Sequence, residues 1–359
     1  MAGFWDGRRV LVTGHTGFKG AWLTMWLEQL GAEVAGFALA PHTEPSLYSL
    51  AGPWPALRHH VGDIRDAREI AAFVADFRPE IVFHLAAQAL VRASYRDPVG
   101  TFATNVQGTL NLLESLRGLS ETAVVLVITT DKVYANDSRG KAFVETDRLG
   151  GADPYSASKA CTEIATHAFR RSYWRDVGTP ALTTVRAGNV IGGGDWSEDR
   201  IVPDVVRAAA VGRPVELRHP TSVRPWLHVL EPLDGYLLLA ETLRSNPSLA
   251  PDALNFGPER GTVLTVSEIV DILNEHLGMR IGWKQSDGTH PPEAAYLLLD
   301  STAAAETLGW RARLSPRAAI EWTAQWYARW TAGESARDLT LEQIARYSAL
   351  TAVTRGKHA

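Results

Sequence analysis

Short apolar runs that are typical of buried β-strands alternate with helical patterns over the first half of the 359-residue chain. Six such runs end near residue 190, namely RRVLVTG, EVAGFAL, the run that closes at VGD, EIVFHLAA, AVVLVITT and ALTTVRAGNV. Helical crossovers return the chain to the same end of a sheet, so the strands must run parallel. The pattern predicts an α/β fold with a doubly wound parallel (Rossmann) sheet, whose ligand crevice lies beyond the carboxyl ends of the strands.

The second half of the chain is less regular. After about residue 188 the pattern loosens into VIGGGDWSEDR and short mixed elements with prolines, although WLHVL and LNFGP still resemble strands. We expect a dinucleotide-binding domain over residues 1–188 with returning segments at about 226–257. A smaller substrate-binding lobe, interleaved with it, is expected over 189–225 and about 258–359.

Composition and charge restrict the classes of partner. The formal net charge of −4 gives no general attraction to nucleic acid or to an anionic membrane, so an acidic ligand must be held by local Arg and Lys. Cys161 is the only cysteine, which excludes an intrachain disulfide and a Cys-based metal cluster. His59 and His60 lack partners at metal-ligand spacing, so no metal is expected. No apolar run approaches the roughly 20 residues that span a bilayer, and the start of the chain has no signal-peptide pattern. We expect a cytoplasmic protein with small-molecule partners.

The stretch TGHTGFKG joins the first strand to the first helix and places glycines at Gly14, Gly17 and Gly20. A glycine turn between a strand and a helix lets backbone N–H groups approach a pyrophosphate at the positive end of the helix. We interpret it as a dinucleotide site. The acidic residue that usually binds the adenosine ribose is absent from FALAPH, so these residues do not decide between NAD and NADP. Asp63, in VGDIRD, either accepts from the adenine amino group or caps the next helix, a role that suits Asp66 better.

Tyr155 and Lys159, in YSASK, stand one helical turn apart and therefore on one face of a helix. A tyrosine with a pKa of about 10 needs roughly 4 kcal/mol of anion stabilisation to ionise near neutrality. An ammonium at about 4 Å and an effective dielectric near 20 supplies about that much, and a cationic nicotinamide ring adds to it. We interpret the pair as a base, although the same spacing also occurs on ordinary helix surfaces.

The fifth strand ends in VITTDK, which places Thr130, Asp131 and Lys132 at the expected crevice. Together, TGHTGFKG, TTDKVY and YSASK resemble the extended short-chain dehydrogenase/reductase family over nearly the whole chain. The segments HLAAQALVRASY, RAGNVIGGGDW with EDRIVPD, and RPWLHVLEPLDGY are similar to the CDP-glucose 4,6-dehydratases of that family, nucleotide-sugar enzymes of bacterial surface polysaccharide such as the O-antigen of lipopolysaccharide.

This resemblance implies a lyase that contains NAD. Its reaction converts CDP-D-glucose to CDP-4-keto-6-deoxy-D-glucose and water, with no net redox change. It also implies cofactor contacts from these residues: Gly14, Thr16, Gly17, Phe18, Gly20, Asp63, Ile64, Leu85, Ala86, Tyr155 and Lys159.

The resemblance further implies catalytic roles. Tyr155 takes the proton of the C4 hydroxyl, Thr130 hydrogen-bonds O4, and Lys159 holds the nicotinamide ribose. Asp131, when protonated, donates to the leaving C6 hydroxyl. Lys132 stands where the related dTDP-glucose dehydratases carry a glutamate, the base for the C5 proton. Lysine there either abstracts that proton, or stabilises the enolate, or simply pairs with Asp131.

Substrate and subunit contacts follow from the same resemblance. Asn189, Arg200 and Arg224 are placed near the nucleotide diphosphate, where a guanidinium fork suits phosphate oxygens. The long helices expected at about 98–118 and 156–174 are candidates for a homodimer face.

Two alternatives stay open. One is another nucleotide-sugar epimerase or dehydratase of the family, although an epimerase needs no acid and base aimed at C6. The other is a non-catalytic NAD(P)-sensing protein, against which the intact Thr130, Tyr155 and Lys159 argue.

Overall fold

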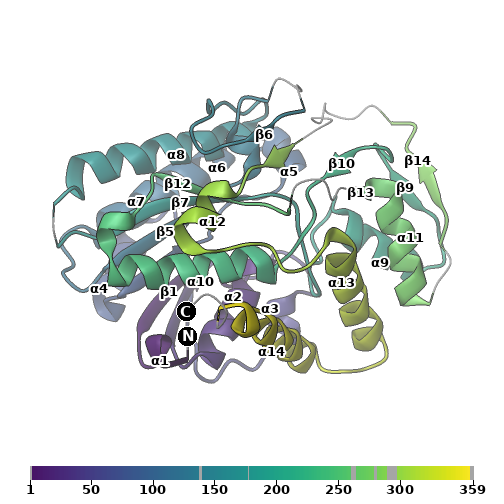
Figure 1. Cartoon of the computed structure of the whole chain (residues 1–359), viewed down its shortest axis with the longest axis horizontal. Helices are drawn as coiled ribbons and strands as arrows, with labels where there is room; N and C mark the ends of the chain where they lie inside the picture. The colour runs from purple at the N-terminus through teal and green to yellow at the C-terminus, as the bar shows by residue number, and fades with distance from the viewer. Residues whose placement is uncertain are drawn as a thin grey trace.

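A seven-stranded parallel sheet forms the centre of the computed structural model, which describes residues 2–136, 140–176, 178–259, 264–278, 281–288 and 297–355 (Figure 1). Its strands are β1 (Arg9–Thr13), β2 (Glu33–Ala38), β3 (Arg58–Val61), β4 (Ile81–His84), β5 (Val124–Ile128), β7 (Ala181–Ala187) and β12 (Ala253–Phe256). The strand order is β12-β7-β5-β4-β1-β2-β3, and every neighbouring pair is parallel. The predicted doubly wound α/β fold is confirmed.

Helices cover both faces of this sheet. Val10 and Val12 of β1 pack into the core that contains α2 (Phe18–Gln29) and α10 (Leu230–Ser245). Leu11, between them, packs into the opposite core with α4 (Ala67–Phe77), α7 (Gly108–Leu116) and α8 (Pro154–Tyr173). Successive strand residues point to opposite faces, so a strand that is covered on both sides must be apolar throughout. This explains why the strands read as continuous apolar runs.

Two of the helices begin where local sequence directs. The Asp66 side chain accepts hydrogen bonds from the backbone N–H groups of Arg68 and Glu69, so Asp66 caps α4 as expected. Asp153 caps α8 by accepting from the Ser156 N–H, and proline occupies the first turn of that helix. The second cap fixes the start of the helix that carries YSASK.

The predicted helix at 98–118 is one continuous stack of three segments: α6 (Pro98–Phe102), a π-helical turn η1 (Ala103–Gln107) and α7. The prediction of a strand at WLHVL is correct only for β11 (Leu227–His228), because α10 begins at Leu230 and its apolar residues cover β5 and β7. The first three residues of LNFGP belong to β12, which pairs with β7 at the edge of the main sheet.

The remaining helices are α1 (Ala2–Trp5), α3 (Leu47–Leu50), α5 (Val91–Arg96), α9 (Ile201–Ala210), α11 (Val266–Leu277), α12 (Thr302–Leu308), α13 (Pro316–Thr331) and α14 (Ala336–Arg355), with short 3-10 turns η2 (Asp131–Val133) and η3 (Pro247–Leu249). The remaining strands form two-stranded pairs: β10 (Val223–Arg224) with β13 (Leu264–Thr265), β11 with β8 (Val190–Ile191), β14 (Trp283–Gln285) with β9 (Val215–Leu217), and β15 (Leu298–Leu299) with β6 (Ala142–Phe143).

The second half of the chain contributes to both parts of the molecule. Helices α9 and α11 with β9 and β14 gather at the right of Figure 1, whereas α14 packs against α2 and α3. The predicted division at residue 188, with a returning segment at 226–257, stays a prediction. None of the helices in the described ranges has the length and apolar character needed to span a membrane.

Candidate functional site

The glycine turn after β1 is built for close approach of backbone. Gly14 has φ +77°, in the left-handed region, and a Cβ there would lie 2.7 Å from the backbone nitrogen of Ala86. A Cβ at Gly20 would lie 2.2 Å from the Gly14 carbonyl oxygen. Gly17 is the N-cap of α2 and offers no capping side chain, so an external acceptor can take the first N–H groups of the helix. The turn therefore fits a pyrophosphate.

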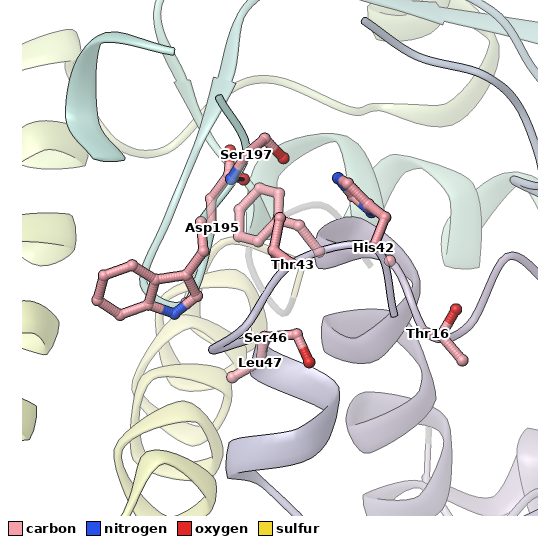
Figure 2. Close-up of a pocket in the computed structure, with 11 residues that line it drawn as sticks. Thr16, His42, Thr43, Ser46, Leu47, Asp195 and Ser197 are labelled. Atoms are coloured by element: carbon pink, nitrogen blue, oxygen red, sulfur yellow. Dashed lines mark hydrogen bonds between the residues drawn. The ribbon is translucent and has the colours of Figure 1, made fainter. Parts of the chain in front are cut away.

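An open pocket continues from this turn toward the second half of the chain. Its walls come from the turn itself, from the segment after β2 and from the loop before α9; they are Thr16, Gly17, Phe18, His42, Thr43, Ser46, Leu47, Gly194, Asp195, Trp196 and Ser197. In Figure 2, His42 and Thr43 lie between Thr16 and the loop that carries Asp195 and Ser197. The lining includes neither TTDK nor YSASK, so this pocket accounts only for the end of the crevice at the glycine turn.

The other expected cofactor residues lie at the ends of β3 and β4. Arg65 binds the Asp63 carboxylate through Nε at 2.9 and 3.0 Å and through Nη2 at 2.6 Å, and its hydrogen bonds hold the pKa of Asp63 below its usual range. Ile64 is buried against Gly108, whereas Leu85 and Ala86 follow β4 beside Gly14. Asp63 is not the cap of α4, which removes the structural alternative, but its contact with adenine stays a prediction.

Thr130, Asp131 and Lys132, which follow β5 after Thr129, form a compact polar turn. Thr130 Oγ1 donates to Asp131 Oδ1 at 3.0 Å and accepts from the Lys132 N–H at 3.4 Å. Asp131 is 1% exposed, and its Oδ2 has no hydrogen-bond partner in the described part of the chain. Burial raises the pKa of Asp131, against the opposing effects of Lys132, Thr130 and Arg224. The carboxyl is therefore biased toward its protonated form, as a general acid requires.

Lys132 is half-buried beside this acid. Within the described residues no ion pair joins its ammonium to Asp131, so simple pairing of the two is not observed.

YSASK stands at the start of α8 beside this turn. Burial raises the pKa of Tyr155 to about 12, while a hydrogen bond with Thr130 acts in the opposite direction. Burial lowers the pKa of Lys159 to about 8, and the charge of Glu163 acts against that change. Lys159 Nζ donates to the Ile128 carbonyl oxygen at 2.9 Å. The structure thus brings Thr130, Tyr155 and Lys159 together.

One electrostatic expectation is wrong for the chain alone. We expected Lys159 to lower the pKa of Tyr155 toward neutrality, but the removal of the phenol from water outweighs nearby positive charge. The Lys159 ammonium is also directed to the Ile128 carbonyl. A base at Tyr155 therefore depends on the additional positive charge that a nicotinamide ring brings.

Lys19 is a site residue that the sequence analysis missed. It follows Phe18 in the glycine turn, and its Nζ lies 5.8 Å from the centre of the Tyr236 ring. Burial first, and then the charges of Arg200 and Lys159, lower the pKa of Lys19 to about 7, whereas Asp131 acts to raise it. The sequence did contain an indication of this role, because Lys19 is a charged residue at the start of the helix whose first turn borders the expected crevice.

This depressed pKa predicts a pH-dependent cost to stability. Between about pH 7 and the usual lysine value of 10.5, the unfolded chain binds more protons than the folded one, so stability rises with pH across this window. Lys19→Met removes this cost and should therefore raise the free energy of unfolding by about 1–2 kcal/mol at pH 7, and by less toward pH 10. The expected gain is kept modest because the Lys19 side chain is still partly accessible to water. Urea unfolding at several pH values measures this, with Lys141→Met as the exposed control. A gain that does not shrink with pH would contradict the burial of the Lys19 charge.

Two of the three expected substrate residues act through their charge on Asp131, Lys19 or Tyr155. Arg224 is 9% exposed and its charge acts on Asp131. Arg200 contacts Asp195 Oδ2 at 3.2 Å through Nη1, and its charge lowers the pKa of Lys19 and opposes the rise at Tyr155. Asn189 accepts from the Leu227 N–H through its backbone oxygen. The structure thus brings both arginines toward the site.

Trp196 and Trp226 pack against other apolar side chains, and the histidines form no metal site among the described residues. Trp226 is 5% exposed in the core, and Trp196 packs edge-on against Tyr327 and Trp330. Among the described residues, no group of three His, Cys, Asp or Glu side chains is placed to hold a metal ion.

Known proteins share this architecture. The chain is 42% identical to a CDP-glucose 4,6-dehydratase of Salmonella typhimurium over 97% of its own length and 98% of the relative's. A dTDP-glucose 4,6-dehydratase of Streptomyces venezuelae solved with NAD bound superimposes with a TM-score of 0.73 at 25% identity, covering 89% of this chain and 97% of that one. A UDP-glucose 4-epimerase of Thermus thermophilus in complex with NAD gives a TM-score of 0.75 at 26% identity, covering 89% and 99%.

The family model described as NAD dependent epimerase/dehydratase family matches residues 10–257, from β1 to the residue after β12. This span contains the glycine turn, the polar turn after β5 and the Tyr155–Lys159 pair. With this match and the near full-length relative, the chain belongs to the NAD dependent epimerase/dehydratase family.

Proposed function

We propose that the protein is a CDP-glucose 4,6-dehydratase, a hydro-lyase that converts CDP-D-glucose to CDP-4-keto-6-deoxy-D-glucose and water. The observation that carries the proposal is Asp131. It is a buried carboxyl, biased toward protonation, with one oxygen that lacks a partner in the described structure, and it lies beside Thr130. An acid aimed at a leaving hydroxyl is what separates a dehydratase from an epimerase. The CDP-glucose assignment follows the Salmonella relative.

The order of steps follows from the acidity of carbon. The C5 hydrogen of a hexose is not acidic until C4 is a ketone, so oxidation at C4 must come first. NAD, when bound, would supply the acceptor for the C4 hydride and, once reduced, the source of the hydride at C6. Tyr155 takes the C4 hydroxyl proton, while Thr130 hydrogen-bonds O4 and Lys159 binds the nicotinamide ribose.

Elimination then uses the polar turn after β5. Asp131 gives its proton to the C6 hydroxyl, which leaves as water. Lys132 either removes the C5 proton or stabilises the negative charge of the enolate. When the hydride is added at C6, C5 takes back a proton. The proton that Tyr155 took from the C4 hydroxyl passes to solvent, and Asp131 is reprotonated from solvent, so the cycle closes with water as the only by-product.

The residues for the two ligands are part of the proposal. NAD contacts are assigned to Gly14, Thr16, Gly17, Phe18, Gly20, Asp63, Ile64, Leu85, Ala86, Tyr155 and Lys159, and the pocket of Figure 2 suits the portion of the cofactor next to the glycine turn. Arg200, Arg224 and Asn189 are assigned to the nucleotide diphosphate of the substrate. The two arginines supply the positive charge that a diphosphate needs.

We also propose a homodimer formed through α6 and α8. Val99 on α6 and Ile164 on α8 are 79% and 59% exposed, which is high for large apolar side chains, and the two helices contact each other. A second copy that covers them would bury this surface. A cytoplasmic place in the synthesis of surface polysaccharide, such as O-antigen, follows only from the resemblance.

A direct assay tests the function. Protein, NAD and CDP-glucose should together produce a 4-keto sugar, detected by its absorbance in alkali, and CDP-glucose should react at least about tenfold faster than dTDP-, UDP- or GDP-glucose, a difference of about 1.4 kcal/mol. The same mixture without NAD, after removal of any copurified cofactor, is the control. Equal rates with dTDP-glucose would remove the CDP assignment, and a 4-epimer without a keto product would favour an epimerase.

A further inference from the structure

A buried ion pair, Glu163 with Arg186, adjoins the turn formed by Thr130, Asp131 and Lys132, because Glu163 binds the preceding Thr129. Glu163 is on α8, one helical turn after Lys159, and pairs with Arg186 of β7; both side chains are 4% exposed. Glu163 Oε1 accepts from Thr129 Oγ1 at 2.5 Å and from Arg186 Nε at 2.9 Å. Its Oε2 accepts from Thr184 Oγ1 at 2.5 Å and from Arg186 Nη2 at 2.8 Å. Four donors thus fix the orientation of this carboxylate.

The pair holds the residues on both sides of the catalytic turn. Thr129, bound to Glu163, comes immediately before Thr130. On the other side, Arg186 Nη1 donates to the Tyr134 hydroxyl at 2.7 Å, and that hydroxyl donates to Asn255 Oδ1 at 2.8 Å. Tyr134 comes immediately after η2 (Asp131–Val133). Glu163 and Arg186 therefore hold the start and the end of the segment that carries Asp131 and Lys132.

The same carboxylate acts on Lys159 through its charge. Burial lowers the pKa of Lys159, and Glu163 is the group that opposes this change. Three other titratable groups face the Lys159 region: Lys19 of α2, His84 of β4 and Asp131 of η2. Burial keeps His84 neutral, with a pKa of about 3, and biases Asp131 toward protonation. Glu163 is therefore the carboxylate whose charge favours the ammonium form of Lys159.

We propose that Glu163, held by Arg186, is a positioning residue: it fixes the Thr130–Lys132 turn against α8 through Thr129 and Tyr134, and its carboxylate, one helical turn from Lys159, stabilises the Lys159 ammonium. It acts through Lys159 and Thr129, because it is itself almost fully buried. The inference rests on the proposed function for the reaction that is followed, but the effect on NAD binding can be measured without that reaction.

Glu163→Gln tests the charge, since glutamine keeps the size of the side chain. An opposite charge within about 4–6 Å typically moves a pKa by about 1–3 units, so its loss should leave Lys159 largely neutral at pH 7. At pH 7 the kcat of Glu163→Gln should be at least about tenfold below that of the wild type. At pH 6, where Lys159 is protonated again in the variant, the two kcat values should differ much less. The NAD dissociation constant, measured by calorimetry without substrate, should show the same pH-dependent ratio.

Two further variants make the result decisive. Thr166→Val changes another buried side chain of α8, a hydroxyl without a hydrogen-bond partner in the described structure. The ratios of its kcat and of its NAD dissociation constant to the wild-type values should stay constant across pH. If the buried guanidinium without its partner prevents Glu163→Gln from folding, the double variant Glu163→Gln with Arg186→Met removes both charges and should keep the pH-dependent loss.

A Glu163→Gln ratio that is constant from pH 6 to pH 9, in turnover and in NAD binding, would overturn the tuning of Lys159. A wild-type protein that binds NAD but does not convert CDP-glucose would instead refute the proposed function. In that case the calorimetric ratio still decides the role of Glu163.

Discussion

Tyr155→Phe is expected to lower the turnover of CDP-glucose by at least about 100-fold, the usual scale of general acid–base catalysis, while NAD binding stays largely intact. The phenol lies beside Thr130 at the end of β5, and phenylalanine removes only its oxygen. The pKa of about 12 that burial gives Tyr155 in the chain alone implies that its activation needs the charge of the bound nicotinamide. Steady-state rates and NAD calorimetry on the same preparation measure both quantities.

Tyr173→Phe, on the same helix but 54% exposed, is the matched control and should turn over at the wild-type rate. Turnover in Tyr155→Phe that matches the wild type would remove Tyr155 from the mechanism. A loss of NAD affinity as large as the loss of rate would mean that the hydroxyl serves the cofactor more than the reaction.

The double variant Asp131→Asn with Lys132→Met should stop elimination but spare the first oxidation. Asparagine cannot supply the proton that Asp131 gives to the C6 hydroxyl, and methionine removes the amine of Lys132. Reduced cofactor should therefore accumulate with CDP-glucose, visible as a rise in absorbance close to one equivalent per site, whereas the wild type should show no net rise. Keto-sugar formation should fall by at least about 100-fold.

Isotope experiments separate the steps. Deuterium at C4 of the substrate should appear at C6 of the wild-type product, and its loss to solvent would contradict an internal transfer. Lys132→Met alone should slow solvent exchange at C5 if lysine is the base and leave it unchanged if lysine is an electrostatic aid. Lys141→Met with Asp147→Asn, an ion pair formed by an exposed lysine and a half-buried aspartate, is the control. Wild-type product formation in the Asp131–Lys132 variant would show that this turn does not perform the elimination.

The central sheet could be predicted because its rules are local or periodic. The strand-to-helix alternation identified six of the seven strands, and LNFGP suggested the last, β12. The glycine turn was predictable for the same reason, since Gly14 and Gly20 occupy positions where a Cβ would meet backbone. WLHVL was harder, because its apolar residues suit a strand and a buried helix equally, and packing of α10 on the sheet decided between them.

Charge effects in the site could not be predicted from spacing. Tyr155 and Lys159 have the expected helical relation, but burial reverses the predicted effect on the Tyr155 pKa. Lys19 reaches the site only because α2 and α10 meet there. The pairing of Glu163 with Arg186 joins α8 to the strand that follows it, β7, and no local sequence pattern predicts such a contact. These features depend on distances that only the folded chain defines.

The place of β12 at the edge of the sheet has a consequence for synthesis on the ribosome. β7 ends at Ala187, but the strand that covers its free edge begins only at Ala253, after β8 to β11, α9, α10 and η3. At roughly 5–20 residues per second, a nascent chain carries β7 as an uncovered edge for several seconds. Exposed edges invite pairing with other chains, and charged side chains reduce that hazard. Arg186, next to the last residue of β7, is therefore placed to protect the growing chain from self-association before it pairs with Glu163.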